Sequence, residues 1–467
     1  MAISNSQQKL IRIGNGAGFW GDNLDAPRLL VENSRAEGLD YLTLEYLAEL
    51  TMSILAHQRR RNPDTGYVTD FLTVMQSLLP HFSARENPRI VTNAGGMNPA
   101  ACAKAVSQLL VGSNLNEIAV AAVSGDDLLP ELDAHLTAGE VFANIETGAA
   151  LEDLRERVAC ANVYLGAEGI VSALQQNADV VITGRVADAA LTIGPAVHEF
   201  GWTWNDWDNL AAATTAGHLI ECGAQVTGGM YSDWDESIAL DDVGYPIAEL
   251  SSDGAVVITK PEKTGGLVSP ATVSEQLIYE IGDPRHYLTP DVGADFSQIT
   301  LQQIGENRVQ VQNAQGQPRP ERLKVSLAYA DGFRATGMLV IAGRNAISKA
   351  RHCGEIIRNR LKQAGSEPAE FNVECIGAGD SLPGIWPAAD VPWDVMLRVS
   401  ARDSSREVIE RFSREFAPLV TSGPPGVTGY TGGRVKPIPV LSYWPTTISR
   451  ERISATVDVR TAQEWLS

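Results

Sequence analysis

Four polar side chains stand close behind short apolar runs in the first half of the chain. Glu45, Asn93, Asp126 and Arg185 each lie within three residues of the end of such a run. When apolar runs form parallel strands, side chains placed in this way meet at the carboxyl edge of one sheet, where open α/β sheets bind ligands. Carboxylates can move protons, an amide can stabilise a developing oxyanion, and a guanidinium can hold a carboxylate or a phosphate. The sequence therefore predicts a site for acid–base chemistry on a small acidic molecule at this edge.

Each of these assignments has a structural alternative. Glu45 could be a solvated group at a helix start, although the run before it should be buried. If residues 45–58 are helical, Glu45 and Glu49 share one face, which suits paired carboxylates, a cation site or simple solvation. Asp126 and Asp127 could bind Mg²⁺ or share a proton, or they could cap a helix. Asp188 follows Arg185 by three residues, so it either faces the ligand or holds Arg185 in a structural ion pair. The residue types alone leave both interpretations open.

A second candidate group lies in the segment 217–229. If this segment begins as a helix, His218 and Glu221 share one face, and Cys222 follows His218 by four residues. The three could form an acid–base set or a metal-ligand set, with Glu221 orienting His218 and Cys222 acting as a nucleophile or a ligand. A lone cysteine is more often a small apolar core residue. Two residues at helical spacing leave open whether a metal binds.

Glycine-rich turns follow two of the apolar runs, and one lysine lies near the expected domain junction. The turn residues are Gly14, Asn15, Gly16, Gly95 and Gly96. Their backbone N–H groups could bind a phosphate or stabilise an oxyanion. The first turn has the spacing GxGxG, which differs from the GxGxxG of dinucleotide-binding domains, and close packing is an equal alternative. Lys260 offers an ammonium that, like Arg185, could hold an anion.

Apolar runs alternating with helical stretches predict an α/β domain over residues 1–245. Several of the runs are apolar throughout, as are strands of a parallel sheet that is buried on both faces. Strands are expected at 10–13, 41–44, 89–91, 118–123, 158–163 and 179–182, and helices at 47–58, 99–110, 166–175 and 187–198. The alternating order of strand and helix makes this a parallel βα-type domain.

Residues 246–467 predict a smaller α+β domain with an antiparallel sheet. Short strands are separated by turn signals such as Ser252-Asp253-Gly254 and Asp331-Gly332. The expected strands lie at 255–259, 308–311, 323–329, 337–341, 372–376, 395–399 and 436–441, and the expected helices lie at 346–363 and 404–416. The resulting order, β-β-α-β-β-α-β, places the helices on one face of the sheet.

The composition is that of an ordinary globular chain. It has 467 residues, 44% of them hydrophobic, and 57 acidic against 37 basic side chains, which gives a net charge of −20. This charge argues against nucleic acid or a membrane surface as a partner. The five cysteines are scattered without zinc spacing, and the sequence has neither an apolar export core nor a membrane-spanning window. We therefore expect a cytoplasmic protein with reduced thiols and a small-molecule substrate, and homo-oligomerisation stays open.

Dense blocks of sequence spread from about residue 10 past residue 440 match one known family. They include Gly14–Asp22, Glu45–Thr51, Thr92–Pro99, Ile182–Arg185 with Asp188, and Gly217–Gly223. In these blocks the chain resembles the acyclic terpene utilisation protein family. The resemblance implies a role in the catabolism of branched or terpenoid acids, at the level of acyl-CoA thioesters. It transfers no catalytic residues, so the candidate site rests on residue chemistry alone.

Three functions remain open at this point. The first is a lyase or hydratase in which Arg185 or Lys260 holds an anion and His218, Glu45 or Asp126 moves a proton. The second is a non-catalytic binding or accessory subunit of an acyl-CoA pathway enzyme, and the third is a metal-dependent hydrolase. We prefer the first, because a scaffold has no evident need for so many polar side chains at strand ends. Coenzyme A, as part of the substrate, and a divalent metal stay open as cofactors.

Overall fold

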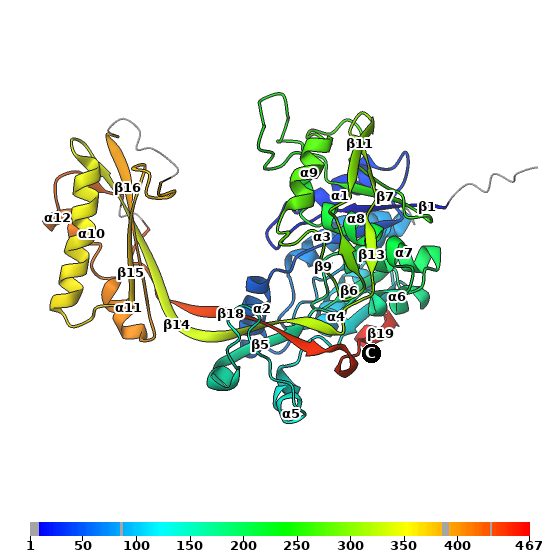
Figure 1. Ribbon diagram of the computed structural model, residues 1–467, viewed down its shortest axis with the longest axis horizontal. Coiled ribbons are helices and arrows are strands. Elements are labelled where there is room, and N and C mark those ends of the chain that lie inside the picture. Colours follow the sequence, from blue (N-terminus) through cyan, green and yellow to red (C-terminus); the bar gives the residue numbers. More distant parts are fainter. Residues whose placement is uncertain (1–8, 85–86, 385–391, 430–431) are drawn as a thin grey trace, which may run out of the picture. The chain divides into compact units, whose positions relative to one another are not determined.

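The chain divides into two compact units. The computed structural model describes residues 9–84, 87–384, 392–429 and 432–467 (Figure 1). Unit 1 comprises residues 9–155, Ala159–Leu327 and Tyr443–Ser467, and unit 2 comprises Glu156–Val158 and Ala328–Ser442. In the described part of the chain, no helix is long and apolar enough to cross a lipid bilayer.

Five parallel strands form the centre of the main sheet in unit 1. In spatial order they are β1 (Leu10–Asn15), β2 (Tyr41–Leu44), β3 (Arg89–Thr92), β6 (Val180–Thr183) and β4 (Ala119–Ser124). Their apolar side chains are buried on both faces, since Leu42, Val91 and Val181 are fully covered. Parallel pairing aligns the carboxyl ends of all five strands, so the residues that follow them share one edge.

One strand expected in this sheet lies elsewhere. β5 (Val158–Val163) has the predicted bounds, but it pairs with the long strand β14 instead of a parallel neighbour. The prediction that it belongs to the parallel sheet was therefore wrong. An apolar run predicts that a strand is buried, and it does not specify which strand will be its partner.

Helices pack against the sheet, for example α4 against β4, α7 against β1 and α8 against β7. Asn98 caps α4 by accepting from the backbone N–H of Ala101, and Pro99 occupies its first position. The helices of unit 1 are α1 (Ala26–Asn33), α2 (Glu49–Arg61), α3 (Asp70–Ala84), α4 (Pro99–Gly112), α5 (Leu132–Thr137), α6 (Glu168–Gln175), α7 (Ala190–Phe200), α8 (Trp207–Ile220) and α9 (Pro270–Ile278).

Antiparallel strands extend the sheet on both sides. β7 (Ile247–Ser251) pairs with β1, and β8 (Val256–Thr259), β12 (Arg308–Gln312) and β11 (Thr300–Gly305) follow it outward. β19 (Thr456–Thr461) pairs with β4 at the other edge. Unit 1 therefore continues past residue 245. A small three-stranded sheet of β9 (Tyr287–Leu288), β10 (Gly293–Asp295) and β13 (Gln315–Gln317) also belongs to it.

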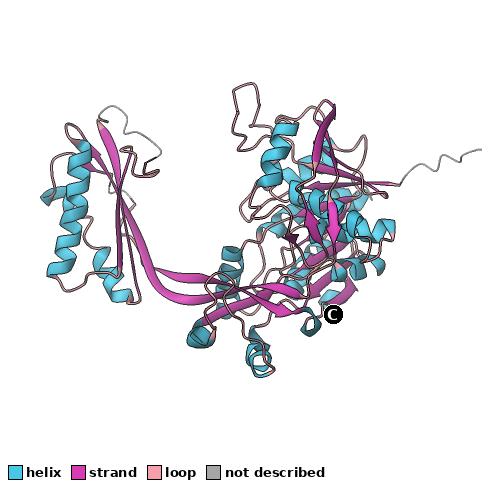
Figure 2. Ribbon diagram, viewed as in Figure 1, coloured by secondary structure: helices cyan, strands magenta, loops and turns pink. Residues whose placement is uncertain are grey.

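Unit 2 is built around an antiparallel sheet. Helices α10 (Ala346–Gln363) and α11 (Arg406–Phe412) pack on one face of β16, as Figure 2 shows. The strands of this sheet are β14 (Arg322–Ala342), β15 (Glu370–Ile376), β16 (Asp394–Asp403), β17 (Val427–Thr428) and β18 (Ile438–Ser449), and the short helix α12 (Leu419–Ser422) follows α11. Residues 322–327 of β14 and 443–449 of β18 belong to unit 1. The predicted fold class is confirmed: a parallel α/β part is followed by an α+β part with an antiparallel sheet.

The hairpin predicted at Asp331-Gly332 was wrong. Here β14 runs through the whole stretch as one strand of 21 residues. Gly332 has φ of +84°, a backbone conformation that glycine adopts without strain. The Asp-Gly pair therefore marks a local irregularity inside the strand and not a turn between two strands.

Candidate active site

A cavity of about 880 Å³ opens at the carboxyl edge of the parallel strands, and all of its lining residues belong to unit 1. We call it the site cavity. Part of its wall is ionisable: Glu45, Arg185 and His218 are buried there, and Glu49, Asp188 and Glu221 are partly exposed. Its exposed wall carries large apolar side chains, namely Phe19, Ile145, Met230 and Leu288. A ligand in the cavity therefore meets both ionisable groups and apolar surface.

Glu45 follows β2 directly and is held in place through one of its two carboxylate oxygens. Oε1 accepts hydrogen bonds from Asn93 Nδ2 and from the backbone N–H of Leu47, the latter at 3.0 Å. Oε2 is buried and has no hydrogen-bond partner among the described residues. Burial, together with the negative charge of Asp188, raises the pKa of Glu45 well above its usual range. Glu45 therefore holds a proton more readily than an ordinary glutamate does, and its free oxygen can present that proton to a ligand.

Arg185 balances the charge of these carboxyl groups. Its Nη1 donates to the carbonyl oxygen of Leu47 at 2.6 Å, and its Nη2 donates to Asp188 Oδ1 at 2.6 Å. The guanidinium also lies over the ring of Tyr164 at 4.1 Å from the centroid. Burial raises the pKa of Asp188 despite this ion pair. Both terminal nitrogens of Arg185 are thus engaged within the protein, so its main effect is to stabilise negative charge in the cavity wall.

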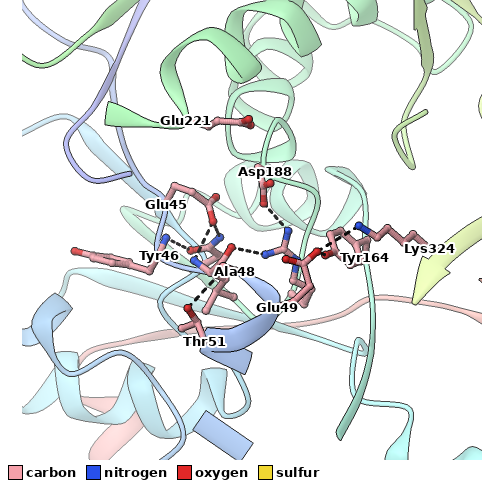
Figure 3. A network of polar contacts seen from close by, with 12 residues as sticks. Glu45, Tyr46, Ala48, Glu49, Thr51, Tyr164, Asp188, Glu221 and Lys324 are labelled. Atoms are coloured by element: carbon pink, nitrogen blue, oxygen red, sulfur yellow. Dashed lines mark hydrogen bonds and ion pairs between the residues drawn. The ribbon is translucent and has the colours of Figure 1, made fainter. Parts of the chain in front are cut away.

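Glu49 forms a second group with Tyr164 and Lys324, two residues that the sequence did not single out. The Tyr164 hydroxyl donates to Glu49 Oε1 at 2.5 Å, and Lys324 Nζ lies 3.3 Å from the same oxygen. Burial would raise the pKa of Glu49, but these two contacts outweigh it and lower the pKa to about 2. In the view of Figure 3, Asp188 lies between Glu45 and this group. Glu49 could be expected from its spacing after Glu45, whereas Tyr164 and Lys324 come from distant segments of the chain.

Glu45 and Glu49 do not share a helix face, because α2 begins only at Glu49. They reach the same cavity from different elements: Glu45 lies in the turn after β2, and Glu49 lies in the first turn of α2. The prediction that a helix over residues 45–58 would place both on one face was therefore wrong, because the helix begins four residues later. The chain still places both carboxylates in the cavity wall, through the β2–α2 connection.

His218, Glu221 and Cys222 lie together at the end of α8. His218 Nδ1 is 3.0 Å from Glu221 Oε1, and all three residues line the cavity. Burial, and then the charge of Glu221, raises the pKa of the Cys222 thiol to about 12. A thiol with so high a pKa stays protonated at neutral pH, so the geometry does not supply the activated nucleophile that was considered for Cys222.

A family model described as acyclic terpene utilisation family protein AtuA matches residues 11–459. This chain belongs to that family. The match confirms the resemblance found in the sequence and connects the chain with acyclic terpene utilisation. No curated protein matches the chain significantly.

Three polar residues of this AtuA-family chain support the cavity wall from behind. Asn15 Nδ2 donates to the carbonyl oxygens of Ile220 and Glu221 at 2.6 and 3.1 Å, which holds the end of α8. Asn93 holds Glu45, as described above. Asp126 Oδ2 accepts from the Arg185 backbone N–H at 3.0 Å, and burial raises the pKa of Asp126 to about 6. Of the residues predicted from the sequence, these three thus lie behind the cavity wall and position the residues that line it.

The predicted glycine turns serve close packing in this family member. A Cβ atom on Gly16 would lie 2.9 Å from Pro27 Cα, and one on Gly95 would lie 2.5 Å from the carbonyl oxygen of Thr183. Gly14 lies equally close to Leu30, and Gly96 packs against Leu55. With neighbouring atoms in these positions, the glycines have structural reasons for their places at the strand ends.

Lys260 lies apart from the cavity wall. Its Nζ donates to the carbonyl oxygen of Thr264 at 2.7 Å, at the end of β8. Burial lowers the pKa of Lys260. The lysine therefore closes a local turn, and the structure does not bring it to the residues around Glu45.

The cavity places cations among its carboxylates. Among the described residues, no group of three or more His, Cys, Asp and Glu side chains is arranged to hold a metal ion. Arg185 and Lys324 instead lie among the carboxylates and supply positive charge there. The cavity thus combines groups that can hold a proton, Glu45 above all, with cations that stabilise negative charge.

Proposed function

We propose that this AtuA-family chain is a catabolic enzyme that acts on a branched or terpenoid carboxylic acid, free or as its CoA thioester. Its reaction class is that of a lyase or hydratase, in which a proton is added to or removed from a carbon near the carbonyl group. The observation that carries this proposal is Glu45, which is buried in the cavity wall with one carboxylate oxygen free of partners among the described residues.

The raised pKa of Glu45 suits this chemistry. A general acid works best when its pKa lies near the working pH, because it must hold a proton and also release it. An ordinary glutamate is ionised at neutral pH, whereas burial raises the pKa of Glu45 well above its usual range and so favours the protonated form. Once Glu45 has given up its proton, the nearby guanidinium of Arg185 stabilises the carboxylate that remains.

Mass spectrometry in D₂O tests this proposal. The protein is incubated with a panel of branched acyl-CoA thioesters and the corresponding free acids, and each product is examined for deuterium on carbon or for addition of water. Glu45→Gln keeps the shape of the side chain but removes its acid–base function, so we expect turnover to fall about 10²- to 10⁴-fold. Glu355→Gln, on the exposed surface of α10, is the matched control and should leave turnover unchanged.

Two outcomes would contradict the enzymatic proposal. Turnover by Glu45→Gln within about threefold of the wild type would remove Glu45 from the reaction. A wild-type protein that is stabilised against heat by an acyl-CoA, but neither exchanges nor hydrates any member of the panel, would instead support a binding or accessory role.

A further inference from the structure

His218 has both ring nitrogens engaged within the protein. Nε2 lies 3.2 Å from the carbonyl oxygen of Leu277, and Nδ1 lies 3.0 Å from Glu221 Oε1. A backbone carbonyl can only accept a hydrogen bond, so Nε2 must carry a hydrogen. The contact between Nδ1 and Oε1 then needs one proton of its own, which lies either on the histidine or on the glutamate.

The ring of His218 is fixed in this position. It is almost completely buried and lies against the rings of Tyr287 and Phe296, with centroid distances of 5.5 and 5.8 Å. Gln276 Nε2 donates to the His218 carbonyl oxygen at 3.1 Å and holds the backbone. His218 therefore cannot turn a nitrogen toward a ligand without losing a buried hydrogen bond.

Glu221, in contrast, has one oxygen that can reach a ligand. It lines the site cavity, and its Oε2 is buried without a hydrogen-bond partner among the described residues. The end of α8 that carries it is held by Asn15, so the position of the carboxylate is set by the fold. The other titratable groups that act on the pair are Asp188, Cys222, Tyr279, Glu280 and Tyr287.

We infer that Glu221 is a second acid–base group of the site cavity and that His218 is a positioning residue, which keeps one proton on the pair so that Glu221 rests as a carboxylate. This role rests on the proposed function. In the elimination direction, Glu221 Oε2 takes the proton from the substrate carbon. Glu45 gives its proton to the departing hydroxyl group, which leaves as water. The two carboxyl groups then regain their resting protonation by exchange with solvent, and hydration is the reverse.

The charge distribution agrees with this assignment. Burial lowers the pKa of His218, but the Glu221 carboxylate and the hydrogen bonds outweigh that effect and raise it above its usual value. A protonated His218 donates from Nδ1 to Oε1 and leaves Oε2 as the basic atom. Glu45 has no such cationic hydrogen-bond partner, because its contacts come from an amide and a backbone N–H. Burial raises the pKa of Glu221 as well, and the charge and hydrogen bond of His218 oppose that effect. The two carboxyl groups therefore differ in their hydrogen-bond partners, and only Glu221 is paired with a group that can carry positive charge, as suits a base beside an acid.

NMR spectroscopy of the full-length protein labelled with ¹⁵N-histidine tests the pair without any substrate. The His218 signals are assigned by their loss in His218→Asn. We expect both nitrogens of wild-type His218 to carry hydrogen at neutral pH. In Glu221→Gln the titration midpoint should fall by more than one pH unit, while Nε2 keeps its hydrogen. A neutral wild-type His218 at pH 7, or one with its only hydrogen on Nδ1, would overturn the assignment even if Glu221→Gln failed to fold.

The chain contains a matched control for this experiment. His352 and Glu355 on α10 have the same spacing of three residues, at 3.4 Å, but both side chains are mostly exposed. Solvent screens such a pair, so Glu355→Gln is the matched substitution at a pair that burial does not strengthen. If the two substitutions changed the NMR signals of their histidines equally, burial would not strengthen the effect of Glu221 on His218.

Kinetics separate this inference from the proposed function. With a substrate in hand, Glu221→Gln should lower kcat about 10²-fold or more, and His218→Asn should move the acidic limb of the pH–rate profile, which reports the ionisation of Glu221, to a different pH. An unchanged profile would leave His218 with only a structural role. Loss of turnover in Glu45→Gln together with a neutral His218 would refute the role of the His218–Glu221 pair and support the proposed enzyme. Unchanged turnover in Glu45→Gln together with a protonated His218 would support the state of the pair and contradict the proposed reaction.

Discussion

Two glutamates four residues apart behave in opposite ways in this protein. Burial raises the pKa of Glu45, whereas the Tyr164 hydroxyl and the Lys324 ammonium lower the pKa of Glu49 to about 2. The difference comes from the atoms that each carboxylate touches and not from the residue type. Glu45 therefore keeps a proton to higher pH than an ordinary glutamate does, while Glu49 remains a fixed negative charge in the same cavity.

Cys222 should react slowly despite its place in the cavity wall. Because burial raises the pKa of its thiol to about 12, only about one molecule in 10⁴ carries a thiolate at pH 8. We expect iodoacetamide to modify Cys222 at least 100-fold more slowly than free cysteine, as measured by peptide mass spectrometry over time. Cys222→Ser should retain turnover on the substrate panel. Labelling as fast as that of free cysteine would contradict the pKa assigned here.

The sequence predicted about half of the site at the scale of single residues. Glu45, Arg185 and Glu221 were found because strand ends and helical spacing are local patterns. Tyr164 and Lys324 could not be found in this way, because Tyr164 directly follows β5 and Lys324 lies on β14, and the pairing of these two strands is long-range. No local pattern states which distant segment will lie beside a given strand end.

The bounds of several helices and strands were predicted better than the pairing of the strands. β2 and α10 have the predicted bounds, because each is marked by an uninterrupted pattern with clear ends. β5 was also delimited correctly but assigned to the wrong sheet, and β14 was divided at a glycine that it accommodates. Hydrophobic periodicity encodes what an element is, while strand pairing depends on the whole chain.

Close contact between two elements makes one glycine critical. A Cβ atom on Gly18, in the loop after β1, would lie 2.6 Å from the backbone carbonyl carbon of Cys222, just beyond α8. Because backbone cannot move aside as a flexible side chain can, Gly18→Ala should lower the free energy of unfolding by about 1–3 kcal/mol, as measured by urea denaturation. A change below about 0.5 kcal/mol would mean that the loop shifts freely.

Gly112 provides the control for that substitution. It ends α4, and a Cβ atom there would meet nothing within 4 Å. Alanine reduces the conformational freedom of the unfolded chain and favours helix, so Gly112→Ala should leave the free energy of unfolding unchanged or raise it by up to about 1 kcal/mol. The pair of variants separates the effect of the contact from that of adding a methyl group.

At the scale of the whole molecule, burial of carboxyl groups sets how stability depends on pH. Asp126 and Asp291 are both buried, and burial raises the pKa of each to about 6. The folded state then holds protons that the unfolded chain has already released, so the free energy of unfolding falls as pH rises from about 4 to about 6. We expect urea denaturation to show lower stability at about pH 7.5 than at about pH 5.

Asp291→Asn tests the origin of that dependence. The Asp291 oxygens accept from the backbone N–H of Ala167, and an amide oxygen can do the same. The variant should therefore lose part of the pH dependence and gain stability near pH 7.5. A shift of about two pH units corresponds to roughly 3 kcal/mol for a fully buried group, which is the upper bound for the gain. Stability that rises steadily from pH 5 to 7.5 would contradict the account.

The exposed apolar wall of the site cavity bears on selectivity. Phe19, Ile145, Met230 and Leu288 meet solvent when the cavity is empty, and a ligand that covers them removes this surface from water. Each methylene group buried in this way contributes about 0.8 kcal/mol, or roughly fourfold in affinity. On the proposed function, discrimination between long and short acyl chains would come from this apolar wall. The ionisable residues would contribute equally to the binding of each acyl compound, because compounds that differ only in chain length present the same head group.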